Sequence, residues 1–220
     1  MLNFIGESSG MDLLIICLAF FIVILFALTI HEWGHSFVAF TQGDTTSKYF
    51  GRLSLNPFKH IDPIGFLCLL LFGFGWAKPV PVNTVKFKNY RKGVFLTSIA
   101  GVTLNFIVSF VCMGLLVLFF SNFNFITANY LLQLIYYILY FGAQINLGLA
   151  IFNMLPIPPL DGFNVILSFT KSTNRFIEFL QKYGFILLLV LLLTNIIDII
   201  FLTVYNFVLP AFGNFWQFIF

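Results

Sequence analysis

Long apolar stretches without charge restrict this chain to a membrane fold more strongly than any other feature of its sequence. A helix needs about 20 mostly apolar residues to cross the ~30 Å hydrocarbon core of a bilayer. Four stretches meet that requirement: 11–40, 93–120, 130–153 and 183–209. Only 9% of the 220 residues are charged and 60% are apolar, too little polar surface for a water-soluble domain. We therefore predict an all-α polytopic membrane protein with about four transmembrane helices.

The composition also excludes other classes of protein. So apolar a chain is neither intrinsically disordered nor a secreted disulfide scaffold nor a nucleic-acid-binding domain. Its three cysteines are far apart in apolar stretches, and we expect them to be small buried hydrophobes: Cys17, Cys68 and Cys112. Residues 1–10 contain no Lys or Arg, so the basic region of a signal peptide is missing and we expect the first helix to be retained.

The basic residues predict the orientation in the membrane. All eleven Lys and Arg lie in two segments, eight within residues 48–92 and three within residues 171–182. The connection at residues 121–129 carries no charge. By the positive-inside rule, both basic segments face the cytoplasm and the N-terminus lies on the opposite side. We expect one integral-membrane domain over residues 1–220, with a core at 11–165 and the fourth helix added after it.

A fifth apolar run, residues 64–76, is too short to cross the membrane. Its 13 residues would span only about 20 Å as a helix, and we interpret it as a re-entrant or interfacial segment. On either side of this run, residues 52–56 and 80–83 alternate polar and apolar. Pro79 and Pro81 limit the second segment to a sheet edge or an irregular extension. We predict a small β-hairpin or sheet on the cytoplasmic side.

The sequence His31-Glu32-Trp33-Gly34-His35 carries the strongest indication of chemistry. Two histidines four residues apart lie on one face of a helix, so both imidazoles can reach the same metal ion. The glutamate beside the first histidine is placed to take a proton from water at that metal. Such polar groups inside an apolar span are costly unless they are paired or bind something. This pattern predicts a zinc site, whereas a pair of haem ligands would not need Glu32.

A catalytic zinc site needs a third protein ligand and an open position. His60 is the one remaining histidine, but Asp161 is the better candidate. It follows a segment with three prolines at positions 156, 158 and 159, where a regular helix must end. The first and third predicted spans both run toward the cytoplasm, so Asp161 can meet His31 and His35 at a similar depth.

Four blocks of sequence carry a resemblance to a known family: HEWGH at 31–35, GRLSLNPFKHIDPIG at 51–65, GWAKPVPVN at 75–83 and NMLPIPPLDG at 153–162. They resemble the site-2 proteases, zinc metalloproteases that cut their substrates within the membrane. The blocks span most of the chain, and the pairing of HExxH with LDG is highly specific. They are most similar to the compact bacterial and archaeal branch, without the PDZ or CBS domains of some relatives.

The resemblance implies a fold and a reaction. It implies a three-helix catalytic core and one Zn²⁺ per chain, held by His31, His35 and Asp161, with Glu32 as the general base. The implied substrates are transmembrane proteins cut within or near their membrane segment, including regulators already clipped by a site-1 protease and leftover signal peptides. We therefore expect an intramembrane metalloendopeptidase in the cell membrane of a prokaryote, surrounded by lipid and with its active site toward the cytoplasm.

Four further residues are predicted to bind substrate. The family often has a Gly-Pro-x-x-Asn pattern in its middle core helix, and here residues 101–105 read GVTLN with Val in place of Pro. Asn105 is expected to contact substrate or to bond a neighbouring helix. Asn153 is expected to orient the proline-rich loop. Val80 and Val82 form an edge that could pair with extended substrate by β-augmentation.

Two rival functions remain open at this stage. A catalytically silent membrane chaperone or receptor could use the same scaffold, although every expected catalytic residue is present. A metal transporter would need coordinating residues along a path, whereas the candidates form one cluster. The sequence does not specify the substrate, the oligomeric state or a gating element, and it gives no clear role to Asp198 in the fourth predicted span.

Overall fold

The chain forms a bundle of membrane-length helices with short helices at one end. The computed structural model describes residues 10–72, 77–121, 129–170 and 174–220. Its α-helices are α1 (Gly10–Thr41), α2 (Thr46–Tyr49), α3 (Pro63–Phe72), α4 (Tyr90–Phe120), α5 (Tyr130–Asn153), α6 (Asp161–Phe169), α7 (Arg175–Leu192) and α8 (Ile196–Ile219). Two 3₁₀ turns, η2 (Pro57–Lys59) and η3 (Thr84–Lys86), lie in the segment between α2 and α4.

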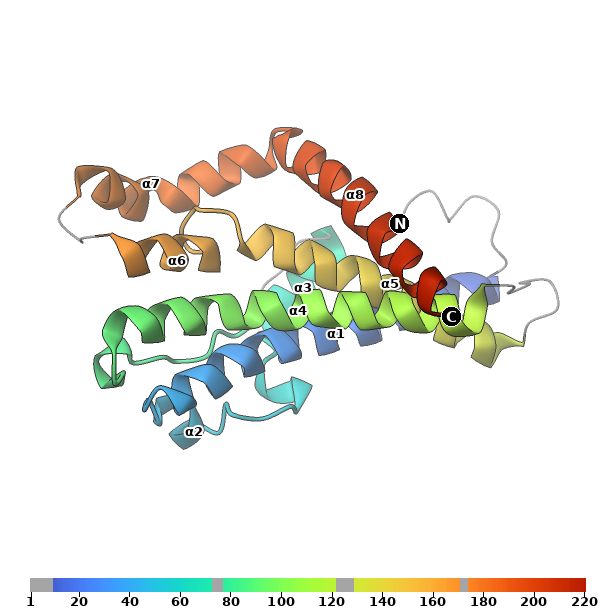
Figure 1. Cartoon of the computed structure of the whole chain (residues 1–220), viewed down its shortest axis with the longest axis horizontal. Coiled ribbons are helices and arrows are strands. Elements are labelled where there is room, and N and C mark those ends of the chain that lie inside the picture. The colour runs from blue at the N-terminus through green and yellow to red at the C-terminus, as the bar shows by residue number, and fades with distance from the viewer. Residues whose placement is uncertain (1–9, 73–76, 122–128, 171–173) are drawn as a thin grey trace.

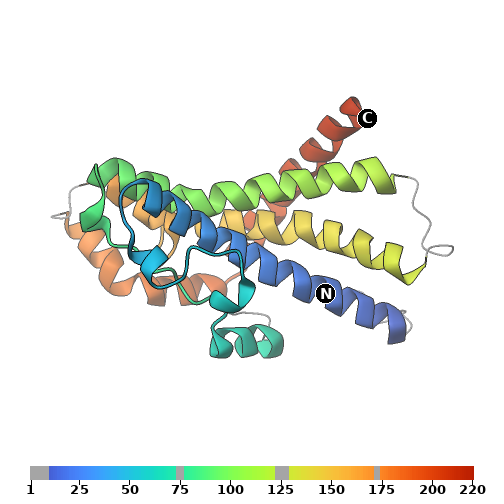
Figure 2. The ribbon, with the colours of Figure 1, turned by 90° about the horizontal axis from the view of Figure 1, so that it is seen from below.

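Four of these helices are long and apolar enough to cross a membrane: α1, α4, α5 and α8. This agrees with the predicted all-α polytopic membrane fold. Helices α1, α4 and α5 lie side by side along the length of the molecule, and α2, α6 and α7 lie toward one end of them (Figures 1 and 2). The chain is therefore an integral membrane protein that crosses the bilayer several times.

Small residues allow the three core helices to pack closely. A Cβ added to Gly34 of α1 would lie 3.2 Å from the backbone of Ala100 in α4. Between α4 and α5, the Ser109 hydroxyl donates to the carbonyl of Ala143 at 2.6 Å. Close approach of backbones and hydroxyl-to-carbonyl bonds are the usual means of association between helices in lipid. These contacts fix the register of α1, α4 and α5.

The fourth span differs from the prediction. The continuous helix expected at residues 183–209 is instead divided between α7 and α8, with a break at residues 193–195. The Thr194 hydroxyl donates to the carbonyl of Leu191 at 2.8 Å, which satisfies a helix-end carbonyl at the break. Asp198 therefore lies in the first turn of α8 and is exposed, a position where the helix dipole favours an acid.

The predicted hairpin on the cytoplasmic side is not found. Among the described residues, β-pairing is limited to one isolated antiparallel bridge between Ile61 and Ala77. Next to it, the amide of Lys78 donates to the carbonyl of His60 at 2.8 Å. Pro79 and Pro81 cannot donate to a ladder, so residues 79–83 run as an extended segment without a strand partner.

The short apolar run expected to be re-entrant contains α3, which lies outside the three-helix core (Figure 2). Ten residues of helix span only about 15 Å, so α3 cannot cross the membrane by itself. Residues 73–76, the end of that run, lie outside the described residues.

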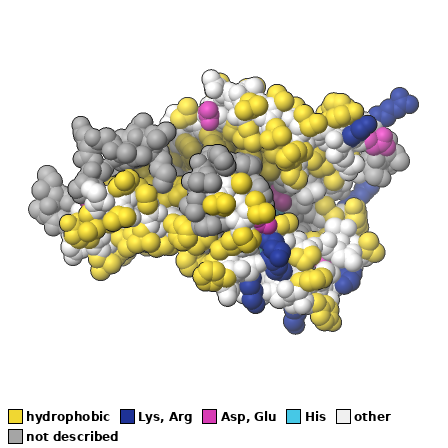
Figure 3. Space-filling model, turned by 180° about the vertical axis from the view of Figure 1, so that it is seen from behind, with side chains coloured by type: hydrophobic (Ala, Val, Ile, Leu, Met, Phe, Trp, Pro, Cys, Tyr) yellow, Lys and Arg dark blue, Asp and Glu magenta, His cyan; other side chains and the backbone are white. Residues whose placement is uncertain are grey.

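Lys and Arg side chains gather at the end of the molecule that carries the segment between α1 and α4 (Figure 3). The opposite end, where α1 begins and α4 ends, contains no Lys or Arg in its described residues.

Candidate metal centre

The two histidines of α1 point at a common position. His31 is buried and His35 is half-buried, and their Nε2 atoms lie 3.0 Å apart. One helical turn separates them, as expected for residues four apart. Because two neutral imidazoles compete for the same small space, this arrangement is favourable when a cation or a proton lies between the nitrogens.

Asp161 completes a triangle with these nitrogens. Its Oδ2 atom lies 3.2 Å from His31 Nε2 and 3.2 Å from His35 Nε2. A tetrahedral zinc site with bonds of ~2.0–2.1 Å has its ligand atoms about 3.3 Å apart. The triangle therefore matches one face of such a tetrahedron, and the donor set of two imidazoles and one carboxylate suits Zn²⁺. This is the group among the described residues that could hold a metal ion.

The proline-rich segment after α5 places Asp161 next to the histidines. Helix α5 ends at Asn153, and α6 begins at Asp161 itself. Prolines in this segment prevent α5 from continuing. A Cβ on Gly162 would collide with the backbone of Met154 and Leu155, so only glycine allows the chain to fold back this tightly behind the aspartate.

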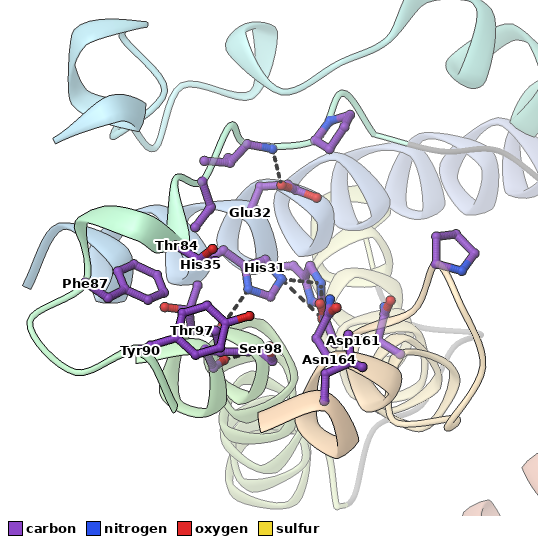
Figure 4. Close-up of a pocket in the computed structure, with 17 residues that line it drawn as sticks. His31, Glu32, His35, Thr84, Phe87, Tyr90, Thr97, Ser98, Asp161 and Asn164 are labelled. Carbon is purple, nitrogen blue, oxygen red and sulfur yellow. Dashed lines mark hydrogen bonds and ion pairs between the residues drawn. The ribbon is translucent and has the colours of Figure 1, made fainter. Parts of the chain in front are cut away.

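The backbone of α4 orients His35. Its Nδ1 atom lies 2.7 Å from the carbonyl oxygen of Thr97, as Figure 4 shows. A carbonyl only accepts, so Nδ1 carries the proton and the lone pair of Nε2 points toward Asp161 and His31. Metal-binding histidines commonly have such a partner for the second ring nitrogen.

Gly101 of α4 provides the space for both imidazoles. A Cβ added there would lie 2.7 Å from His31 Nδ1 and 2.8 Å from His35 Nε2. Any side chain at this position would displace the rings, so the site requires a glycine at this position of α4. Sequence reasoning treated Gly101 only as part of a family pattern and missed this role.

Glu32 lies on the other side of the triangle, next to the segment between α3 and α4. Its Oε2 atom accepts a hydrogen bond of 2.9 Å from the amide of Val80 (Figure 4). This contact connects the carboxylate to the extended segment at residues 79–83. Glu32 therefore lines the same cleft as the histidines and connects α1 to the segment before α4.

A cleft of about 390 Å³ contains the triangle and Glu32. Its apolar lining comes mainly from the segment before α4 and from α4 itself, and includes Val80, Val82 and Val94. Asn153 also lines it, and its amide donates to the carbonyl of Leu149 at 3.0 Å. The structure thus brings Val80, Val82 and Asn153 to the predicted site.

Asn105 lies elsewhere. It is fully buried within the bundle and is not among the residues that line the cleft. His60 is also remote from the cleft lining. It is buried, and its Nε2 atom lies 2.7 Å from the carbonyl of Ser54, which ties together the loop that precedes α3.

Asp44 anchors the extended segment that forms one wall of the cleft. Its carboxylate accepts hydrogen bonds from the amides of Asn83 (2.6 Å) and Thr46 (2.9 Å) and from the Thr46 hydroxyl. Burial by itself would raise the pKa of Asp44, but these hydrogen bonds and nearby Lys86 together hold that pKa below its ordinary value. Asp44 therefore joins the end of α1 to the segment that contacts Glu32.

Sequence reasoning missed several polar residues of the cleft: Thr84, Thr97, Ser98 and Asn164. Figure 4 shows Asn164 beside Asp161, one helical turn further along α6. Its spacing of three residues from Asp161 was a usable signal, because such residues share a helix face. The positions of Thr97 and Ser98 depend on how α4 packs against α1 and carry no such local signal.

Comparison with known proteins gives a consistent result. The model of peptidase family M50 matches residues 19–192. "Putative zinc metalloprotease YwhC" of Bacillus subtilis is 41% identical over 79% of this chain and 79% of its own length. "Putative zinc metalloprotease Rip2" of Mycolicibacterium smegmatis is 28% identical over 77% of this chain and 64% of its own length. No solved structure matches the chain significantly.

Proposed function

This chain belongs to peptidase family M50, the site-2 protease family, and we propose that it is an intramembrane zinc endopeptidase. His31, His35 and Asp161 would hold one zinc ion, and Glu32 would serve as the general base. The observation that carries this proposal is the convergence of three ligand atoms, 3.0–3.2 Å apart, in a cleft that also contains a carboxylate. Bound zinc would supply a Lewis acid that acidifies water and polarises a peptide carbonyl.

The residues of the chain would perform the remaining steps. Glu32 would take the proton of the attacking water and pass it to the amine that leaves. The carbonyl of Thr97 would keep His35 in the tautomer whose Nε2 lone pair faces the metal. The covered position of the triangle, with His31 buried, would limit access of bulk water to the cleft.

The cleft suits an extended apolar peptide. The lining of the cleft includes the carboxylates of Glu32 and Asp161 but no Lys or Arg among the described residues, so apolar residues of a membrane segment would meet no basic side chain. A helix with side chains is about 10–12 Å wide, which favours an unwound substrate. We therefore propose that the substrate is a transmembrane protein, including one already cut by a site-1 protease.

Residues 79–83 would pair with that extended substrate. The amides of Val80 and Asn83 are bonded to Glu32 and Asp44, whereas the amide of Val82 bonds no other described residue. Because Val82→Pro removes this donor, it should reduce cleavage of a transmembrane reporter without loss of zinc. Unchanged cleavage would rule out pairing through Val82.

The charge distribution supports a cytoplasmic orientation of the site. Lys and Arg gather at the end of the molecule that carries the segment between α1 and α4 (Figure 3), and this segment lines the cleft, which favours a cytoplasmic site. In a cysteine-free background, Phe58→Cys would place a thiol at a position that is 83% exposed. An impermeant thiol reagent added to intact cells should leave it unlabelled, and labelling would reverse the proposed orientation.

The first experiment is a zinc measurement on detergent-purified protein. Wild type should contain about one zinc per chain, and Asp161→Ala should lose most of it. Asp198→Ala, which removes an exposed acid from α8, is the matched control and should keep the metal. Wild-type protein that binds no zinc even after reconstitution would overturn the proposed function and favour a silent membrane chaperone or receptor.

A further inference from the structure

His31 and His35 differ in the hydrogen-bond partner of Nδ1, the ring nitrogen that does not face Asp161. Nδ1 of His35 is bonded to the Thr97 carbonyl. Nδ1 of His31 is buried and has no hydrogen-bond partner among the described residues. If Nε2 of His31 binds a metal, Nδ1 carries a proton and needs an acceptor, because buried donors are rarely left unpaired.

One unpaired amide lies on α4, one helical turn beyond the residue that faces this nitrogen. Asn105 is 0% exposed, and neither its Oδ1 nor its Nδ2 has a hydrogen-bond partner among the described residues. Asn105 follows Gly101 by four residues, so both lie on the same face of α4. Gly101 is the residue whose surface contacts the Nδ1 edge of the His31 ring.

Helix geometry directs the Asn105 side chain toward this ring. In an α-helix, each Cα–Cβ bond tilts toward the N-terminus, so a side chain covers the turn that precedes it. For Asn105, the preceding turn on that face is Gly101, which has no side chain to occupy the space. The antiparallel register agrees, because His35 meets Thr97 and His31, one turn back along α1, meets Gly101.

We infer that Asn105 is a positioning residue for the metal centre, whose amide oxygen would accept the Nδ1 proton of His31 when the metal is bound. It would hold the His31 ring as the Thr97 carbonyl holds the His35 ring. This assignment rests on the proposed zinc site and replaces a direct contact of Asn105 with substrate. It accounts for two buried unpaired groups, His31 Nδ1 and Asn105 Oδ1, with one interaction.

The test is zinc affinity, measured by competition with a chelator on purified protein. Asn105→Leu removes the acceptor at similar size and should weaken zinc binding about 10–100-fold, the usual cost of losing such a partner. Asn105→Asp keeps an acceptor oxygen and should stay within a few-fold of wild type. Where Leu prevents folding, Asn105→Ala makes the same test.

Asn146 of α5 offers a matched control. It is also buried, at 2% exposure, and its Oδ1 has no hydrogen-bond partner among the described residues, but it lies on a helix that supplies no metal ligand. Asn146→Leu should keep wild-type zinc affinity. Equal losses in both Leu variants would indicate general damage to the bundle and would overturn the assignment.

A cobalt-substituted protein adds a readout that simple packing would not change. The visible absorption of bound Co²⁺ should shift in Asn105→Leu and not in Asn146→Leu, because only the first variant would alter how His31 is held. Zinc affinity and a cobalt spectrum both unchanged in Asn105→Leu would overturn the inference and leave the proposed function intact. Wild-type protein without zinc affinity would instead overturn both.

Discussion

Helices α1 and α8 are both long and apolar enough to cross a membrane, yet they serve the molecule differently. In the most apolar part of α1, 39% of the residues are buried inside the protein, compared with 6% in α8. Helix α1 carries His31, Glu32 and His35, whereas α8 supplies no residue to the cleft. Polar groups in a membrane helix need protein around them, so the helix that carries the candidate site residues lies in the core.

The attachment of α8 also differs in kind. Its aromatic residues bond backbone carbonyls of the core helices: Tyr205 donates to Gln144 and Trp216 donates to Phe110, each at 3.0 Å. These rings pack against Gly148 and Gly114, where a Cβ would collide with them. Further along α8, Phe212 and Phe215 pack against aromatic rings of α4. Helix α8 thus contacts the core through aromatic side chains and leaves most of its surface for lipid.

The largest effect is expected for Glu32 of α1, whose proposed catalytic role can be separated from metal binding. Glu32→Gln should lower the rate of cleavage by about 10²–10⁴-fold, the usual contribution of a general base, because the amide cannot take the proton. Zinc content should stay at the wild-type level, since Glu32 is not one of the three proposed ligands. Cleavage of a transmembrane reporter in detergent or vesicles measures the rate. Asp198→Asn in α8 should cleave at the wild-type rate.

A pair of glycine substitutions compares the two regions directly. Gly101→Ala places a methyl group 2.7 Å from the His31 ring, and such overpacking costs about 1–3 kcal/mol. This corresponds to roughly 5–150-fold weaker zinc binding. Gly213→Ala in α8 meets no other atom within 4 Å and should leave zinc affinity unchanged. Isothermal titration or chelator competition distinguishes them, and equal effects would contradict the contrast between core and periphery.

Asp44 gives the site end of the molecule a pH dependence. Since its pKa is lowered in the folded protein, its contribution to stability is complete above the unfolded pKa of about 3.9 and is lost as pH falls through the folded pKa. Asp44→Asn should cost about 1–2 kcal/mol at pH 7. Thermal unfolding in detergent should show this difference shrinking below pH 4. A constant difference would mean that the carboxylate charge is unimportant.

The smallest effect is expected in α8. Trp216→Phe keeps most of the ring packing against Gly114 and removes the hydrogen bond to Phe110. The loss should be about 0.6–1 kcal/mol of stability, with no change in zinc affinity. Thermal unfolding and zinc competition on the same samples make the comparison. Weaker zinc binding in this variant would show that α8 contributes to the site after all.

Several elements of the fold could be predicted from the sequence because their signals are local. The apolar runs of α1, α4 and α5 have the length and hydropathy of membrane spans, and the structure contains helices at these positions. The break between α7 and α8 was missed, because Thr194 and Asn195 lie between two long apolar runs and do not lower the average hydropathy of the predicted span enough to divide it. At the break, the amide and the hydroxyl of Thr194 both donate to the carbonyl of Leu191. Hydropathy does not register such bonds.

The candidate site could also be predicted from the sequence only in part. The four-residue spacing of His31 and His35 determines by itself that both imidazoles share a face of α1. Other features of the site depend on contacts between separate helices. The register of α1 against α4 places Gly101 and the carbonyl of Thr97 beside the two imidazoles, and the fold-back after α5 places Asp161 there. Periodicity within one helix is a property of the local chain, whereas the meeting of separate helices is decided by how their surfaces pack. The sequence therefore determined a membrane protein with a metal-binding motif, and only the tertiary structure decided what surrounds that motif.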